Sequence, residues 1–550
     1  MAHITLVTSG RFRYILKICE GELLSRSIFL AGLFETVSLC SGLGRCKRCS
    51  IRFLPKSSVL PPPSDSETEI LGTQAISEGW RLACRHAAAH GMLLELPPLH
   101  IEKIAQPDPP PQAYAWTAYR KLAVDFGSTT VHLLPLSGGF EANSALFSVP
   151  FRADAVIRAN PQAGAGSDVI SRLAFAADRQ NCLKLHKLSI DGLTRMFPPM
   201  AAFEEMVIAG NPAMLCLLLD KPCAGLSSAP YRLEYLGGCA ENIDKLPPIW
   251  TSPLISPFVG GDISAGYAAL ALNPQQKTPY PFILADMGTN GEFLLAIDEH
   301  TAFAVSLPLG PALEGIGMDC GAEAKPGVIV SFELTPGGLQ YKTIGNMPAT
   351  FKATGISATG YISLLDRLRK CGLLDQNGHF ASDHRALDSP LSGISVKLSS
   401  AVKNISGVPA FFVTDKLYAS ARDIEELLKI KAAFSVALET LLDIAGLKPA
   451  GLRAVYLAGA FGEHVDKAAL AGLGFIPRGL LNKTIVAGNT SLAGAALLAL
   501  KPDLRQKLSI WATKVISIDL AGQPGFQDKF TNAMNFGRQT EQKRPSKGTE

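Results

Sequence analysis

One short pattern occurs twice in this chain, 161 residues apart. The segments KLAVDFGSTTVHLL, around Asp125, and FILADMGTNGEFLL, around Asp286, each place Asp-x-Gly and small polar residues between two apolar strands. Such a hairpin offers backbone N–H groups and hydroxyls at its turn and a carboxylate at its strand end, which suits a phosphate chain and its Mg²⁺. A single hairpin of this kind would more often be a plain turn. Two copies predict duplicated lobes that clamp one nucleotide.

Two glycine-rich segments support this prediction. LRAVYLAGAFGEHVDKAAL runs from an apolar strand through a glycine loop into a helix, and such a loop can receive adenosine or phosphate closely. SPFVGGDISAGYAALAL places Asp262 at a helix start, where it could act as an N-cap, as a site residue, or as both. The dipeptide Gly-Lys and the pattern G-x-G-x-x-G are both absent, which excludes the usual P-loop and Rossmann fingerprints.

The order of these motifs resembles the actin, Hsp70 and sugar-kinase superfamily. The resemblance implies that Asp125, Asp262 and Asp286 hold Mg²⁺ through water and orient the attacking water. It implies phosphate binding by Gly127, Ser128, Thr129, Thr130, Gly288, Thr289, Asn290 and Gly291, and adenosine binding by Gly459, Ala460, Phe461 and Gly462.

Four of the 11 cysteines form a pattern near the N-terminus. Cys40, Cys46, Cys49 and Cys84 have the spacing C-x5-C-x2-C-x34-C. Four thiolates can hold a [2Fe–2S] cluster, and plant-type ferredoxins also have three close cysteines and a distant one, with a first gap of four residues. A zinc site is the alternative, but structural zinc usually takes two close pairs. An odd cysteine count in a reducing compartment argues against a disulfide framework.

The flanks of the cysteine pattern predict a small sheet. HITLV and RYILKI form a pair of strands, and GELLSRSIFLAGLF follows as a helix with Leu24, Ile28 and Ala31 on one face. Residues 1–96 thereby resemble the β-grasp ferredoxins. Cys19 has no place in the cysteine pattern and is interpreted as an ordinary buried residue.

The domain organisation follows from proline content and periodicity. We expect an α/β multidomain chain: a β-grasp ferredoxin-like domain over 1–96, then a two-lobed actin-like (ribonuclease H-like) ATPase. Six prolines make 97–119 a linker. Residues 120–205 form a middle region with the first phosphate hairpin, and 206–505 form the C-terminal ATPase domain. Residues 506–550 form an extension whose tail loses apolar periodicity after about Phe536.

Charge and hydropathy restrict the partners. Lys and Arg number 52 and Asp and Glu 48, which gives a net charge of +4 without a long basic face, so neither nucleic acid nor an anionic membrane is the expected partner. No uncharged apolar run reaches the length of about 18 residues that spans a bilayer, and the N-terminus lacks a signal-peptide core. We therefore expect a cytoplasmic protein.

The combination of a ferredoxin-like domain, a linker and an actin-like ATPase resembles the reductive activators of corrinoid proteins. This resemblance covers about residues 3–500 and includes NPQAGAGSDVISR, IAGNPAML with Asn211, GPALEGIGMDCGAEAKPGVI, GISATGYISLLDRLRKCGLLD, TDKLYASARDIEELLKIKAAF and AGNTSLAGAALLAL. It implies ATP-dependent reduction of a Co(II) corrinoid to Co(I), with electrons from an external low-potential donor entering through the [2Fe–2S] cluster. The corrinoid would arrive on a partner protein, because the chain lacks the D-x-H-x-x-G signature of cobalamin binding.

The energetics of such a pairing are reasonable. A plant-type cluster has a potential of about −400 mV, and a Co(II) corrinoid needs a stronger donor. For one electron, about 59 mV is a tenfold change in equilibrium, or about 1.4 kcal/mol, so a binding difference of a few kcal/mol can close a gap of roughly 100 to 200 mV. The nucleotide state can supply such a difference.

Three other functions stay open at this point. The chain could be the activator ATPase of another low-potential metalloenzyme, although activators of radical dehydratases usually hold a [4Fe–4S] cluster between subunits. It could be a carbohydrate kinase-like protein with an appended ferredoxin, or an electron carrier without enzymatic activity. The last of these would not need both Asp125 and Asp286. A homodimer is an open expectation that the sequence does not decide.

Overall fold

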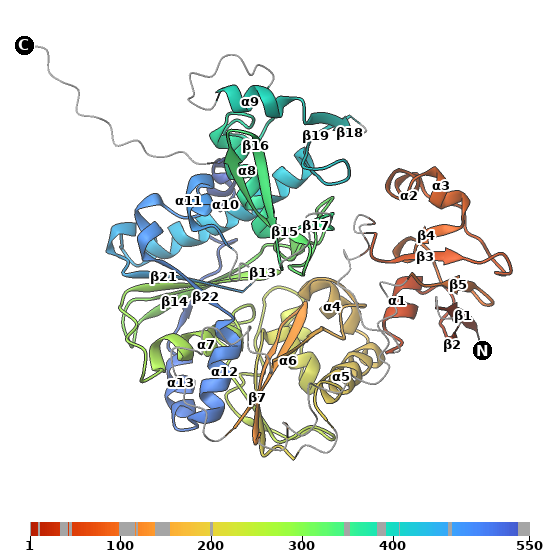
Figure 1. Cartoon of the computed structure of the whole chain (residues 1–550). Helices are drawn as coiled ribbons and strands as arrows, with labels where there is room; N and C mark the ends of the chain where they lie inside the picture. The colour runs from red at the N-terminus through yellow and green to blue at the C-terminus, as the bar shows by residue number, and fades with distance from the viewer. Residues whose placement is uncertain are drawn as a thin grey trace, which may run out of the picture.

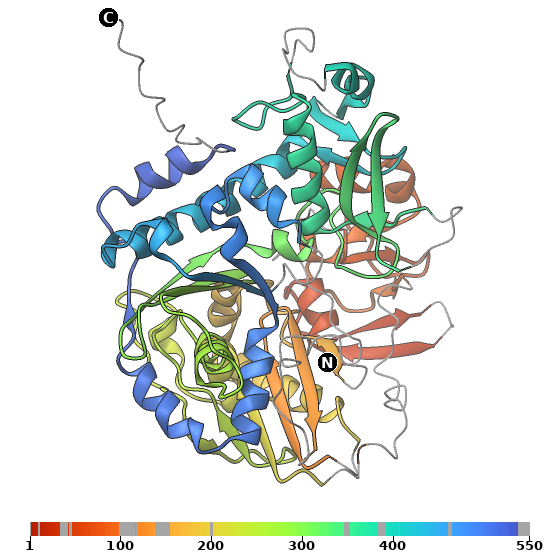
Figure 2. The ribbon, with the colours of Figure 1, turned by 60° about the vertical axis from the view of Figure 1, so that its left-hand side comes forward.

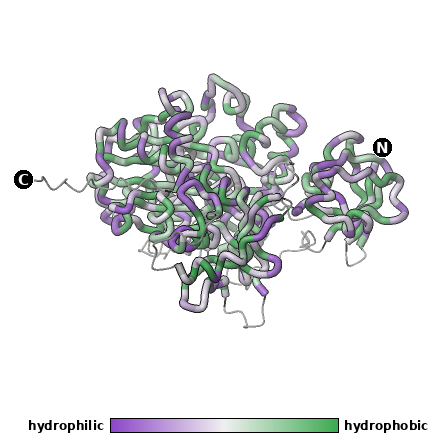
Figure 3. Tube along the Cα trace, turned by 90° about the horizontal axis from the view of Figure 1, so that it is seen from above, coloured by the Kyte–Doolittle hydropathy of each residue, from purple (hydrophilic) through white to green (hydrophobic). Residues whose placement is uncertain are grey.

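The computed structural model describes residues 2–8, 12–32, 42, 44, 47–97, 116, 119–137, 155–198, 202–345, 352–381, 392–405, 407–459 and 465–536. Within these residues the chain forms a small N-terminal domain and a larger body of two lobes (Figure 1). The predicted mixed α/β class is confirmed. None of the described helices combines the length and the apolar character needed to cross a membrane. Figure 3, which is coloured by hydropathy, shows the N-terminal domain to one side of the body.

The N-terminal domain is built on a five-stranded sheet. Its strands are β1 (His3–Val7), β2 (Arg13–Lys17), β3 (Ser50–Phe53), β4 (Trp80–Leu82) and β5 (Leu93–Glu95). Their order is β2-β1-β5-β3-β4, with β1 antiparallel to β2 and parallel to β5. This is the order of a β-grasp sheet, and the predicted first strand pair is confirmed. Its helices are α1 (Leu24–Phe29), α2 (Asp65–Leu71) and α3 (Thr73–Ser77).

Helix α1 covers this sheet as its sequence pattern predicts. Leu24 and Ile28 are fully buried and pack with Ile4 and Leu94 of the sheet. The helix ends at Phe29, so Ala31 follows it rather than continuing its face. The prediction that Cys19 is buried is wrong: Cys19 is exposed, because it lies in the turn after β2, where its carbonyl accepts from the Glu22 N–H at 3.2 Å.

The first lobe contains the first Asp-x-Gly hairpin. Its strands are β6 (Lys121–Phe126), β7 (Thr130–Leu136), β8 (Val156–Ala159), β9 (Glu205–Ala209), β10 (Ala240–Glu241) and β11 (Ile249–Thr251), in the order β10-β11-β9-β6-β7-β8. Its helices are α4 (Val169–Ala176), α5 (Arg179–Thr194) and α6 (Pro212–Leu219). Because β6 pairs in parallel with β9, this sheet takes strands from both sides of residue 205, the position chosen for the end of the middle region.

The second lobe repeats this arrangement. Its strands are β12 (Phe282–Met287), β13 (Asn290–Ala296), β14 (Ala302–Pro308), β21 (Ala454–Gly459), β22 (Thr484–Gly488) and β23 (Ile516–Ser517), in the order β22-β21-β12-β13-β14-β23. In each lobe a three-stranded antiparallel meander is extended by parallel strands on the side of its first strand. The predicted pair of duplicated lobes is therefore confirmed by topology.

Two helices join the lobes, namely α7 (Gly261–Tyr267) and α12 (Thr490–Leu500). They pack so closely that a Cβ on Gly494 of α12 would collide with the backbone of Ala265 in α7. One hydrophobic cluster contains residues of both sheets together with both helices, including Val207, Leu284 and Leu497. The two lobes therefore share a core behind the cleft.

The remaining elements belong to the second lobe and the C-terminal segment. They are β15 (Val328–Thr335), β16 (Gly338–Thr343), β17 (Gly355–Ile356), α8 (Ala358–Lys370), α9 (Ser392–Ser399), β18 (Val402–Ile405), β19 (Val408–Phe412), β20 (Tyr418–Ser420), α10 (Ala421–Ile444), α11 (Lys467–Leu473), α13 (Leu504–Ala512) and α14 (Phe526–Ala533). Helix α14 packs on the long helix α10 (Figure 2). The tail beyond Phe536 and most of the predicted linker lie outside the described residues. Trp116, at the end of the linker, is buried in the core of the first lobe.

Candidate functional site

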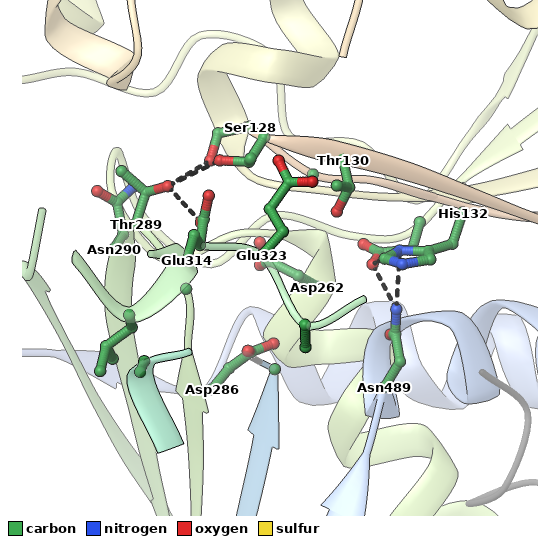
Figure 4. A pocket seen from close by; sticks show the side chains of 18 of the residues that line it. Ser128, Thr130, His132, Asp262, Asp286, Thr289, Asn290, Glu314, Glu323 and Asn489 are labelled. Carbon is green, nitrogen blue, oxygen red and sulfur yellow. Dashed lines mark hydrogen bonds and ion pairs between the residues drawn. The ribbon is translucent and has the colours of Figure 1, made fainter. Parts of the chain in front are cut away.

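A cavity of about 340 Å³ lies between the lobes. Its walls include most of the residues that the motifs predicted for nucleotide binding: Asp125, Gly127, Ser128, Thr129, Thr130, Asp262, Asp286, Gly288, Thr289, Asn290 and Gly459. The β6–β7 and β12–β13 hairpins face each other across this cavity (Figure 4). Gly291 is not among the lining residues: it pairs with Met287 within the second hairpin and packs against Leu309.

The first hairpin holds its carboxylate in a fixed orientation. Asp125 lies near the end of β6, and both of its oxygens accept hydrogen bonds from the start of α12: Oδ2 from Asn489 Nδ2 at 2.7 Å and Oδ1 from Ser491 Oγ at 2.8 Å. His132 Nδ1 lies 3.4 Å from the same Oδ2. Asn489 also caps α12, since its Oδ1 accepts from the Leu492 N–H at 2.8 Å. The N-terminus of α12 therefore sets the position of Asp125.

The segment NPQAGAGSDVISR supports the same hairpin from behind. Asn160 is fully buried; its Nδ2 donates to Gly127 O at 2.7 Å and its N–H donates to Thr129 O at 2.8 Å. These bonds fix the turn on both sides of Ser128. Asn211, which could line the cleft or act as a plain cap, does both: it lines the cavity, and its Oδ1 accepts from the Met214 N–H at the start of α6 at 3.0 Å.

Carboxylates dominate the electrostatics of the cavity. Burial, together with the negative charges of Asp262 and Asp125, raises the pKa of Asp286 to about 8. Burial likewise raises the pKa of Asp262 to about 6 and that of Glu292 well above its usual range. Glu292 is 4% exposed, and its Oε1 has no hydrogen-bond partner among the described residues. Such a cluster has the oxygen donors and the uncompensated charge that a hard divalent cation would neutralise.

The carboxylates are not close enough together to hold such a cation alone. Within the described part of the chain, no three His, Cys, Asp or Glu side chains are arranged as direct ligands. The residues therefore fit a cation that reaches them through water. Asp262 lies in the first turn of α7 and is not its N-cap, because Gly260 occupies that position; its Oδ1 accepts from the adjacent Ile263 N–H at 2.9 Å.

The tips of the two hairpins touch through hydroxyl groups. Thr289 Oγ1 lies 3.1 Å from Thr129 Oγ1 and accepts from Ser128 Oγ at 3.3 Å. It donates in turn to Glu314 Oε1 at 2.7 Å. Burial raises the pKa of Glu314, whose Oε2 is without a partner among the described residues. Three of the four hydroxyls predicted for phosphate binding, those of Ser128, Thr129 and Thr289, are thus gathered at one point between the lobes.

Strand β21 brings the third predicted motif to the cavity. It pairs in parallel with β12, so that Gly459 stands opposite Met287. Gly459 has a φ of +80°, and a Cβ there would collide with the Asp286 carboxylate. Only a glycine therefore lets the chain pass this carboxylate and enter the loop. Ala460, Phe461 and Gly462, the rest of the predicted adenosine motif, lie outside the described residues, as does His464.

The motifs alone did not single out several residues of the cavity: His132, Glu292, Glu314, Glu323, Ser357, Thr359, Gly488 and Asn489. Six of the eight, all except His132 and Glu292, lie in segments that resembled the corrinoid activators, and for these six the resemblance was the available signal. Glu314 and Glu323 belong to GPALEGIGMDCGAEAKPGVI, and Asn489 belongs to AGNTSLAGAALLAL. His132 and Glu292 lie in the hairpins themselves, each directly opposite the aspartate of its hairpin, so the register of the paired strands is the signal that could have found them.

The described members of the cysteine pattern lie together at one end of the N-terminal sheet. Cys49 immediately precedes β3, and Cys84 follows β4 in the short 3₁₀ helix Ala83–Arg85. The Ala83 N–H donates to Cys49 O at 3.0 Å, which continues the register of the two strands. Both cysteines are buried, at 1% and 7% exposure. Cys40 and Cys46 lie outside the described residues.

The loop between the cysteines fits a cluster. Gly42 and Gly44 have φ angles of +82° and +73°, a conformation that other residues rarely adopt. A Cβ on Gly44 would come within 2.7 Å of Arg85 Nε, so this loop passes directly against the segment that carries Cys84. The two buried thiols supply half of the four thiolates that a [2Fe–2S] cluster requires.

Comparisons with known proteins agree with this architecture. Residues 121–275 match the family model described as "RACo middle region", and residues 281–547 match "C-terminal domain of RACo the ASKHA domain". A corrinoid activation enzyme of Eubacterium limosum, RamQ, is 25% identical over 411 residues, which cover 69% of this chain and 65% of that protein. The [Co(II) methylated amine-specific corrinoid protein] reductase of Methanosarcina barkeri is 27% identical over 374 residues, covering 61% and 63%. Both alignments therefore span slightly less than two thirds of the relative.

A solved structure shares the fold over nearly the whole length. The reductive activator for corrinoid, iron-sulfur protein is 19% identical, with a TM-score of 0.64 over 97% of this chain and 98% of that chain. At this identity the likeness establishes the fold alone. The family rests on the two RACo models, which follow one another over residues 121–275 and 281–547 and together match most of the chain: the chain belongs to the RACo family and carries its C-terminal ASKHA ATPase domain.

Proposed function

We propose that this chain is an ATP-dependent reductive activator, which transfers one electron to a Co(II) corrinoid on a partner protein and so forms Co(I). The observation that carries the proposal is the combination of buried Cys49 and Cys84 in a β-grasp domain with the duplicated hairpin cavity of an ASKHA ATPase. The names of both curated relatives, one an activation enzyme and the other a reductase of a Co(II) corrinoid protein, support the same reaction.

In the proposed mechanism the cavity binds MgATP. The turn amides and hydroxyls of Ser128, Thr129 and Thr289 bind the phosphates, after exchanging the bonds that they now make with one another. Asp125, Asp262 and Asp286 hold the cation through its water ligands and orient the attacking water. The hydrogen bonds from Asn489 and Ser491 hold the Asp125 carboxylate in the orientation that this role needs. The adenosine would lie against the glycine loop that Gly459 begins.

In the N-terminal domain, Cys40, Cys46, Cys49 and Cys84 would hold a [2Fe–2S] cluster. Bound there, the cluster would supply single electrons at low potential, replenished by an external low-potential donor. The chain's own part is to exclude water from the thiolates through burial and to hold the domain beside the lobes. Thiolates of this kind suit a reducing compartment, and the proposal places the reaction in the cytoplasm.

ATP drives the uphill step by changing the relative affinity of two lobe arrangements for the corrinoid protein. Closing a gap of roughly 100 to 200 mV for one electron needs about 2 to 5 kcal/mol, which is within reach of such a binding difference. The shared core behind the cleft lets the lobes move relative to each other without separating.

The test is the yield of Co(I) from a purified Co(II) corrinoid protein and a chemical reductant, measured by absorbance with and without MgATP. We expect Co(I) to accumulate only when MgATP and the cluster-loaded chain are both present. Asp286→Asn is expected to lose the ATP dependence and Cys84→Ser to lose the electron transfer. Equal yields with and without MgATP would refute the proposal, and transfer of labelled phosphate from ATP to a sugar would indicate a kinase instead.

A further inference from the structure

An ion pair connects the cysteine loop with the nucleotide cavity. Arg48 lies between Cys46 and Cys49 in the sequence, and its Nη1 is 3.4 Å from Glu323 Oε1. Glu323 is one of the residues that line the cavity, and Figure 4 shows its side chain among the other cavity residues. A residue of the cysteine loop therefore contacts the wall of the nucleotide site directly, although the two are 275 residues apart in the sequence.

Backbone hydrogen bonds hold the chain in place near both residues of this pair. Next to Arg48, the Ser50 N–H donates to Lys47 O at 3.1 Å and the Ala83 N–H donates to Cys49 O at 3.0 Å. On the other side, the Ala322 N–H donates to Ile356 O at 3.0 Å, which holds the loop of Glu323 against β17. A displacement of either loop would therefore be transmitted to the other through the ion pair.

The N-terminal domain also contacts the first lobe through α1 and the residues after it. Leu30 is 2% exposed and belongs to the hydrophobic core of that lobe, together with Leu173 of α4. The Arg26 guanidinium lies over the ring of Phe175, 5.1 Å from its centre. The domain thus spans the cleft: α1 rests on the first lobe, and Arg48 reaches the second. The N-terminal domain can therefore make both contacts at once only in some arrangements of the two lobes.

The charges at this contact determine whether docking of the N-terminal domain favours or opposes nucleotide binding. The cavity wall carries Asp125, Asp262, Asp286, Glu292, Glu314 and Glu323, all of which repel a phosphate chain when they are ionised. Glu323 is neutralised by Arg48 and by Lys325, whose Nζ lies 3.1 Å from Glu323 Oε2. A docked Arg48 therefore lowers the repulsion that incoming phosphates meet. By linkage, a bound nucleotide must favour the docked position of Arg48 by the same factor.

We propose that Arg48 makes the cluster domain a sensor of the nucleotide: a nucleotide in the cavity and a cluster domain docked through the Arg48–Glu323 pair stabilise each other. The inference rests on the proposed function only in taking the cavity as the nucleotide site. It assigns Arg48 and Glu323 as positioning residues, which hold the cluster domain at the cleft when the cavity is filled.

The first test measures the affinity of the full-length, cluster-loaded protein for MgADP by calorimetry. Arg48→Gln is expected to weaken binding about fivefold, and Arg48→Lys to retain most of the affinity, because it keeps the charge. Arg52→Gln is the matched control: Arg52 is in the same domain, but its partners are Glu78 O at 2.9 Å and Glu95 Oε2 at 3.5 Å, both within that domain. Cluster content, read from absorbance, must be equal in all four proteins.

The second test follows docking itself, by amide hydrogen exchange of α1 and α4 with and without MgADP. In the wild-type protein we expect nucleotide to slow exchange at both helices. Glu323→Gln, which changes the other partner and leaves the cysteine loop intact, is expected to lose this protection. The inference is overturned if Arg48→Gln binds MgADP like the wild type, or if nucleotide accelerates exchange at α1. If instead the wild-type protein binds no nucleotide, the proposed function itself has failed.

Discussion

Thr289 is the residue at which the tips of the two hairpins touch. Its hydroxyl contacts Ser128 and Thr129 of the opposite hairpin and donates to Glu314. A hydroxyl has one proton to donate and two lone pairs, so these three contacts use its full capacity. A phosphate oxygen accepts, so it can bind this hydroxyl only in place of Glu314, which now receives the single proton. Nucleotide binding at Thr289 therefore has to rearrange the hydrogen bonds at the point where the two hairpins meet.

Replacing this hydroxyl gives a direct prediction. Thr289→Val keeps the volume of the side chain and removes the group that would donate to a phosphate. Hydrogen bonds to charged groups contribute about 1.5 to 3 kcal/mol, so the affinity for MgATP is expected to fall at least about tenfold in equilibrium titrations. Thr335→Val is the control, because the Thr335 hydroxyl donates to Gly338 O in a hairpin away from the cavity. Equal affinities for the two variants would contradict the role of Thr289.

Asn489 combines two tasks that can be separated by experiment. Asn489→Ala removes the N-cap of α12 and the donor to Asp125. Loss of a cap costs about 1 kcal/mol, and denaturant unfolding should show this destabilisation. Asp178→Ala removes a comparable cap, that of α5, where Asp178 accepts from the Asn181 N–H at 3.0 Å. We expect similar losses of stability, but a weaker affinity for MgATP only in Asn489→Ala. A loss of affinity in both variants would mean that stability alone is responsible.

At the residue scale, the sequence allowed prediction of the groups that belong to a repeated local pattern. Asp125 and Asp286 were predictable because each lies at the end of an apolar strand before a glycine turn, and the pattern occurs twice. Asn489 was not, because it reaches Asp125 across 364 residues and its position depends on how α12 packs between the lobes. Glu323 likewise lines the cavity only because β17 holds its loop there.

At the scale of elements, the C-terminal helix α14 is attached to α10 through a buried lysine. Lys431 is 5% exposed, and its Nζ donates to Ala533 O, at the end of α14, at 3.1 Å. Burial, together with the positive charge of Arg369, lowers the pKa of Lys431 to about 8. The folded protein therefore releases this proton at a lower pH than the unfolded chain does.

This difference predicts a dependence of stability on pH. Between about pH 8 and 10.5 the unfolded chain binds more protons at this position, so the free energy of unfolding rises with pH, by on the order of 2 to 3 kcal/mol relative to Lys431→Met. The measurement is urea unfolding at a series of pH values. Lys429→Met, on the same helix, is the control, since hydrogen bonds to Glu425 and Glu426 raise the pKa of Lys429. A constant difference between wild type and Lys431→Met across this range would contradict the prediction.

The local sequence pattern was sufficient to predict the strands, but it predicted the ends of the helices less well. The alternation in HITLV and in both hairpins predicted strands that form as expected. Helix α1 ends at Phe29, two residues before Ala31, although Ala31 still packs against the core of the N-terminal domain. The prediction that Cys19 is buried was wrong because the residue lies in a surface turn, where an apolar side chain has no core to pack against.

At the scale of the whole molecule, the order of motifs was predictable and the contacts between domains were not. The duplicated lobes follow from the repeated hairpin, which the matching strand orders of the two sheets confirm. The position of β9 beside β6 could not be read from the sequence, because parallel pairing joins strands about 80 residues apart in the chain and leaves no local signal. The docking of the N-terminal domain across the cleft depends on single residues of that domain and of the two lobes. These residues form no pattern in the sequence.

Gly164 offers a test of that docking which changes neither the cysteine loop nor the cavity. A Cβ at this position would come within 3.0 Å of Leu30 Cδ2 and of the Phe29 backbone, so Gly164→Val is expected to force α1 away from the first lobe. Small-angle scattering should show a larger radius of gyration.

If docking and nucleotide binding support each other, Gly164→Val must also weaken MgADP binding by about the fivefold factor expected for Arg48→Gln, although Gly164 lies in the first lobe and Arg48 in the N-terminal domain. Gly479→Val is the control, because a Cβ on Gly479 would meet nothing within 4 Å. A larger radius of gyration with unchanged affinity would show that the N-terminal domain docks independently of the nucleotide.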